Sequence, residues 1–64
     1  MTLAEVVERV KAKLNMETAM LVWDDGYTDY LDEMLETHGD RKVMDYEVNS
    51  KENYVIVEFE EEEE

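Results

Sequence analysis

The 64-residue chain has no cysteine, no proline, two glycines and one histidine. Without cysteine, no disulfide can cross-link the fold and no thiolate cage can hold a metal. Two glycines are too few for a glycine-rich loop that would cradle phosphate groups. Because domains of this size usually need an additional source of stability, we expect the chain to form a homodimer.

Positive charge is also scarce: six Lys and Arg stand against 19 Asp and Glu, which gives a net charge of −13. Such a charge disfavours direct binding to nucleic acid or to anionic lipid. The longest apolar run, Ala19 to Trp23, is too short to span a membrane, and the amino terminus does not resemble a signal peptide. We therefore expect a cytoplasmic protein without a membrane or nucleic-acid partner.

The apolar periodicity predicts one α+β domain over residues 1–59, with elements in the order α-β-α-β-β. The predicted elements are a helix over 3–14, a strand over 18–23 buried on both faces, a helix over 29–38, and a hairpin of strands over 43–48 and 54–59. They would form a small three-stranded, mostly antiparallel sheet with both helices on one face. For the glutamate run at 60–64 we expect a disordered tail.

Local signals support the two helices. Thr2 and Glu5 have the spacing of a capping box, Thr28 is placed to cap the second helix, and Gly39 is placed to end it. An alternative for the second segment remains open, because the turn sequence at 24–26 can instead close a hairpin into a strand over 27–31.

The alternation in the last two strands leaves a second face of the sheet without a helix. On this face we expect Val43, Tyr54 and Ile56 to be partly exposed, and they are the candidate dimer surface.

Residues with catalytic chemistry are few. Ser50 would lie in the hairpin loop and His38 at the end of a helix, so the two have no evident common pocket. A calcium-binding loop centred on Gly26 fails in register, since its first ligand would be Leu21. The sequence predicts no enzyme, no cofactor and no metal site.

Acidic residues are concentrated in the middle of the chain. From Leu14 to Asp40 there are eight acids and no Lys or Arg. Four of the eight have the spacing of one helical face: Asp29, Asp32, Glu33 and Glu36. A solvated helical face is often acidic, and the helix dipole favours acids in its first turn, but an ordinary surface helix would mix the two signs. Carboxylates about 5 to 6 Å apart along a helix can also imitate the phosphates of a nucleic-acid strand.

In size, acidity and lack of Cys and Pro, with acids lining a helix, the chain resembles the small DNA-mimic proteins of bacteriophages. Among these it is similar in kind to the inhibitor of the bacterial nucleoid protein HU. The resemblance implies competition with DNA for a basic groove, by a dimer whose two acidic helices span that groove, in the cytoplasm of a bacterial host. DNA mimics share no common fold, so the resemblance assigns no individual residue.

These observations predict a non-enzymatic DNA-mimic inhibitor of a basic, HU-like DNA-binding protein. The predicted partner-binding residues are Asp24, Asp25, Asp29, Asp32, Glu33, Glu36 and Asp40, with Glu17, Asp45 and Glu47 as possible extensions. The alternative is an acidic adaptor or regulator that binds a basic patch on an enzyme such as RNA polymerase.

Overall fold

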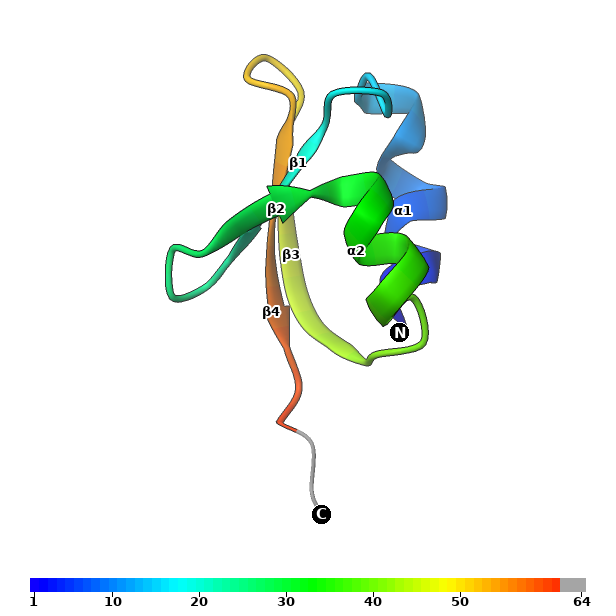
Figure 1. The fold of residues 1–64 in the computed structure, drawn as a ribbon, viewed down its shortest axis with the longest axis vertical. Helices are drawn as coiled ribbons and strands as arrows, with labels where there is room; N and C mark the ends of the chain where they lie inside the picture. Colours follow the sequence, from blue (N-terminus) through cyan, green and yellow to red (C-terminus); the bar gives the residue numbers. More distant parts are fainter. Residues whose placement is uncertain (62–64) are drawn as a thin grey trace.

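Two helices lie on the same face of a four-stranded sheet in the computed structural model, which describes residues 1–61 (Figure 1). In chain order the elements are α1 (Leu3–Val10), a 3-10 turn η1 (Lys11–Lys13), β1 (Met20–Trp23), β2 (Thr28–Tyr30), α2 (Leu31–His38), β3 (Val43–Asn49) and β4 (Tyr54–Phe59). The strand order is β2-β1-β4-β3, with β1 parallel to β4 and the two outer pairs antiparallel. The α+β class is as predicted, but the sheet has four strands rather than three and is mixed.

α1 begins at the predicted capping box. The Thr2 hydroxyl accepts a hydrogen bond from the Glu5 backbone N–H at 3.4 Å, and a Glu5 carboxylate oxygen accepts one from the Thr2 N–H at 3.1 Å. These bonds satisfy two of the backbone donors that a helix leaves free at its start. The α-helix ends at Val10, short of the predicted boundary, and the chain continues to Lys13 in 3-10 geometry.

The segment after β1 combines the two structures that the sequence left open. Gly26 adopts a φ of 94°, which favours glycine, and the Trp23 N–H donates to the Tyr27 carbonyl at 2.7 Å, so the turn closes a hairpin. Strand β2 follows for three residues, and α2 starts at Leu31 rather than at 29. Thr28 pairs with Val22 in the sheet, and Tyr30 is the residue before the first turn of α2, so the prediction that Thr28 caps this helix is wrong.

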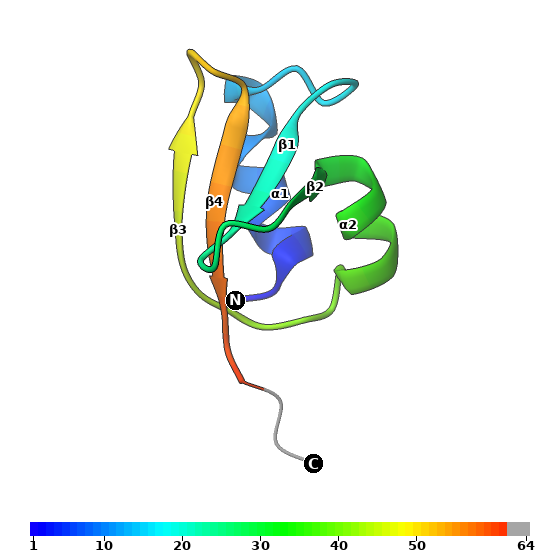
Figure 2. The same cartoon turned by 60° about the vertical axis from the view of Figure 1, so that its left-hand side comes forward.

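One apolar layer between the helices and the sheet forms the core. Leu3, Val6 and Val10 from α1 are buried with Leu31 and Met34 from α2. The sheet contributes, among others, Leu21, Val55, Val57 and Phe59. The other face of the sheet has no helix within residues 1–61 (Figure 2). For this reason the predicted burial of β1 on both faces is wrong: Leu21 is buried, and its strand neighbours are only half-buried.

The start of β3 also differs from the predicted alternation. The pairing of β3 with β4 shifts between Val43 and Asp45, and the Val43 N–H donates to the Met1 carbonyl at 2.7 Å. This irregularity turns Val43 into the core, where it is 4% exposed, and leaves Met44 64% exposed. Val43 is thus not part of the helix-free face, which corrects the predicted dimer surface.

The shift can be tested by truncating the two neighbouring residues separately. We expect Val43→Ala to lower the free energy of unfolding by about 2 kcal/mol, because two buried methyl groups are lost. Met44→Ala should change it by less than about 0.5 kcal/mol, as for other exposed positions. Urea denaturation followed by Trp23 fluorescence measures both values. A larger loss for Met44→Ala than for Val43→Ala would contradict this register.

Candidate functional site

Three of the predicted acids lie together on α2. Asp32, Glu33 and Glu36 are all exposed, and we call them the helix trio. Asp32 and Glu33 lie in the first turn, where the partial positive charge of the helix dipole favours a carboxylate. Asp40 is exposed in the loop after the helix.

Asp29, the fourth member of the predicted row, is not on the helix. It lies on β2 opposite Leu21, is half-buried, and accepts a hydrogen bond from the Tyr30 N–H at 2.8 Å. The predicted row of four carboxylates on one helix is therefore wrong, because the hairpin moves the start of α2 past this residue.

Asp24 and Asp25 are exposed in the turn between β1 and β2. Asp25 has a local structural role, since its carboxylate accepts a hydrogen bond from the Tyr27 N–H at 3.0 Å. Glu17 lies near the opposite end of the sheet, where the Asn53 side chain of the β3–β4 turn accepts a hydrogen bond from the Asn15 N–H at 2.7 Å. The structure thus does not bring Glu17 together with Asp24.

A second acidic group gathers on the helix-free face. Asp24, Asp45, Glu47 and Glu58 line a shallow hollow of about 160 Å³ together with Ile56 and Tyr46. We call these four carboxylates the sheet cluster. Asp45 and Glu58 are direct cross-strand partners, an arrangement in which like charges destabilise a sheet. The cluster continues toward Glu60 and Glu61, which line a neighbouring hollow with Asp24 and Glu58.

Three of the residues named from the sequence therefore belong to this cluster, namely Asp24 and the two extensions Asp45 and Glu47. Glu58 was not predicted. The predicted hairpin could have located it. In an antiparallel hairpin of 43–48 with 54–59, the end of the second strand, which holds Glu58, lies beside the start of the first strand, which holds Asp45. Of the predicted tail, Glu60 donates its backbone N–H to the Lys42 carbonyl at 3.0 Å, and residues 62–64 lie outside the described part.

The described strands contain no Lys or Arg, although they contain four acids. Three of the six bases lie on α1 and η1, and the others are Arg41, Lys42 and Lys51 in connections. Lys11 forms an ion pair with Glu8 at 2.9 Å, far in sequence from both acidic groups.

One basic side chain has a packing role at the end of the sheet. The Arg41 guanidinium lies over the rings of Trp23 and Phe59, at 5.0 and 4.8 Å from their centroids. The two rings are 4.6 Å apart, and the His38 ring meets Trp23 edge-on at 6.1 Å. Such cation–π contacts attach the loop after α2 to β1 and β4.

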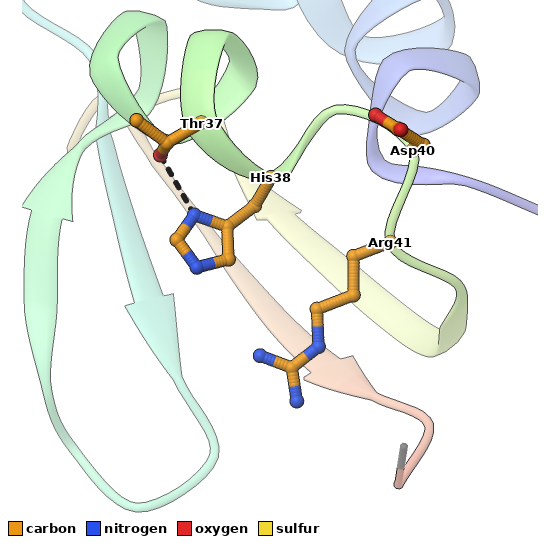
Figure 3. A pocket seen from close by; sticks show the side chains of 4 residues that line it. All are labelled: Thr37, His38, Asp40 and Arg41. Atoms are coloured by element: carbon orange, nitrogen blue, oxygen red, sulfur yellow. Dashed lines mark hydrogen bonds between the residues drawn. The ribbon is translucent and has the colours of Figure 1, made fainter. Parts of the chain in front are cut away.

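Figure 3 shows the pocket at these cation–π contacts, which is lined by Thr37, His38, Asp40 and Arg41. The Thr37 hydroxyl and His38 Nδ1 are 2.7 Å apart in a hydrogen bond. Ser50 lies in the β3–β4 turn, at the other end of the sheet from His38, so the two do not form a nucleophile and base pair.

Within residues 1–61, no three His, Asp or Glu side chains are arranged to hold a metal ion. No helix in this part of the chain is long and apolar enough to cross a membrane.

The structure leaves two of the three residues of the predicted dimer surface on the helix-free face. Tyr54 and Ile56 are half-buried there, whereas Val43 is in the core. The homodimer itself stays a prediction, because the structure contains one chain.

Comparison with known protein families, with characterised proteins and with solved structures finds no match to this chain.

If the Asp45 and Glu58 carboxylates repel each other across the strands, replacing one of them with a base should stabilise the fold. We expect Glu58→Lys to raise the free energy of unfolding by about 0.5 kcal/mol at low salt, because a pair of like charges becomes a pair of opposite charges. Glu17→Lys is the matched control, with the same change in net charge at an exposed acid outside the cluster. Urea denaturation at low and high salt compares the two. An equal gain in both variants would show that only net charge matters, and that the cluster carries no local strain.

Proposed function

We propose that the chain is a non-enzymatic inhibitor that mimics DNA and occupies the basic DNA-binding groove of a host protein, with an HU-like nucleoid protein as the preferred target. The observation that carries the proposal is the concentration of acids on elements without bases. Exposed acids gather on α2 and at one end of the sheet, and neither α2 nor the described strands contain Lys or Arg.

This distribution supports binding to a basic surface rather than mere solubility. A solubility function is served by acids and bases interspersed over the surface. Here the Asp45–Glu58 pair places two like charges directly opposite each other, which costs stability. Two carboxylates that lower the stability of the free protein are expected at a surface where a basic partner neutralises them.

The mimicry would be electrostatic. A basic groove attracts DNA because phosphate charges follow one another at short intervals, and exposed carboxylates offer the same sign and similar spacing. The helix trio presents its three charges within two turns of α2. Association driven by such fields is fast and weakens as salt is added.

The second candidate is the acidic adaptor that binds a basic patch on an enzyme such as RNA polymerase. The helix-free face of the sheet favours it, since Tyr54 and Ile56 could supply apolar contacts beside the acids. An adaptor of this kind would bind with a shallow salt dependence and would not displace DNA.

The proposal is tested by competition in a gel-shift assay. The wild-type chain should release DNA from an HU-type protein at low salt. The variant Asp32→Lys, Glu33→Lys, Glu36→Lys should compete at least about tenfold less well, since it reverses the charge of the whole helix trio.

The matched control is Glu8→Lys, Glu17→Lys, Glu52→Lys, which changes net charge equally at exposed positions outside both acidic groups. It includes Glu17, a predicted extension of the partner-binding residues, because the structure places Glu17 apart from both groups. It should compete within about threefold of the wild type, as expected when charges outside the contact surface change. Failure of the wild type to release DNA would exclude the HU-like target. Equal loss in the two triple variants would show that the helix trio is not the contact surface.

A further inference from the structure

The helix-free face of the sheet is organised in rows that the strand register defines. One row runs across all four strands through Tyr30, Met20, Tyr54 and Asn49. The next row contains Thr28, Val22, Ile56 and Glu47. Beyond it, at the end where the β1–β2 turn lies, are Glu58, Asp45 and Asp24. The face therefore changes from apolar to acidic along the strands.

The apolar rows are unusual for a sheet face without a covering layer. The open face of such a sheet is normally polar, because it meets water. Here Tyr30 is 51% exposed, and Met20, Val22, Tyr54 and Ile56 are half-buried with no helix over them within residues 1–61 (Figure 2). Side chains of this kind, gathered in one patch, are typical of a protein-binding surface.

The negative charge on this face favours a partner that carries positive charge. Asp24, Asp45 and Glu58 border the apolar rows on one side, and Glu47 ends one of these rows on β3. The described strands carry no Lys or Arg. A second copy of this chain would bring the same acids and no base from its own strands. A nucleic acid would bring more negative charge. A basic protein segment would neutralise the acids while its apolar side chains cover the rows.

We propose that this sheet face is a docking surface for a partner protein segment that carries an apolar strip bordered by lysine or arginine. The proposal deepens the proposed function and rests on it, since both require a basic partner. To the charges of α2 it adds an apolar contact on β1 and β4.

Long basic side chains suit the boundary between the two parts of the face. The stem of a lysine or arginine can pack on Ile56 while its charged end reaches Asp45, Glu47 or Glu58. Tyr54 is held by a hydrogen bond from Asn49 at 3.2 Å, so an aromatic contact is already positioned in the neighbouring row. Central aromatic and aliphatic contacts bordered by charge are where binding energy concentrates in protein interfaces.

The first experiment maps the contact without assuming a target. The probe is a short peptide of alternating lysine and leucine, and its control has serine in place of leucine at equal charge. Backbone amide signals of the ¹⁵N-labelled chain are recorded during each titration. We expect the leucine peptide to shift signals of Val22, Tyr54 and Ile56 and the serine peptide to bind at least about tenfold more weakly.

The second experiment compares two double variants in the same titration. Val22→Thr, Ile56→Thr removes apolar surface from the face and keeps β-branched side chains in the strands. Met16→Thr, Leu35→Thr is the control, because both residues are half-buried apolar side chains packed against the core away from this face. The face variant should weaken binding of the leucine peptide about tenfold and the control less than about threefold. Circular dichroism verifies that both variants are folded.

Three outcomes would overturn the proposal: shifts confined to α2, equal affinity for the two peptides, or equal weakening by the two double variants. Sedimentation of the chain alone provides a further check, because a dimer that dissociates in the Val22→Thr, Ile56→Thr variant would assign the face to a second copy. If the chain fails to release DNA in the gel-shift assay but the leucine peptide binds the helix-free face, the HU-like target is rejected. The assignment of this face as a docking surface for a basic, apolar segment then stands.

Discussion

The fold depends on the packing of α1 and α2 against one face of the sheet. Leu3 and Val6 from α1 and Leu31 from α2 meet Leu21 and Val55 from the two central strands, and all five are fully buried. In a chain of this size there is no second layer to build, so the opposite face of the sheet meets water. The aromatic and apolar residues on that open face are therefore available for a partner.

Much of this architecture is predictable from local signals. The capping box of Thr2 and Glu5 and the period-two pattern of 54–59 specify α1 and β4, because each signal is strong and lies within one element. Strand β2 is not predictable in the same way. Its three residues, Thr28 to Tyr30, carry no apolar alternation, and the helical period that begins at Leu31 extends backwards through exposed tyrosines.

The candidate site is less predictable than the fold because it depends on register. The register shift between Val43 and Asp45 decides which side chains of β3 enter the core. No local sequence pattern predicts this shift. The hairpin at Gly26 removes Asp29 from the predicted helical row. The pairing of β3 with β4 brings Glu58 to Asp45, so acids that are distant in sequence meet on the sheet. Composition predicts that the surface is acidic, but only the strand pairing locates the second acidic group.

We propose that the acidic surface binds a basic protein through charge, as DNA does. The most direct measurement is the affinity of an HU-type protein for this chain as a function of salt. We expect binding at low salt that weakens by about tenfold or more between roughly 50 and 200 mM, the behaviour of a contact made through several charges. An affinity that stays constant over this range, or no binding at the lowest salt, would contradict the account.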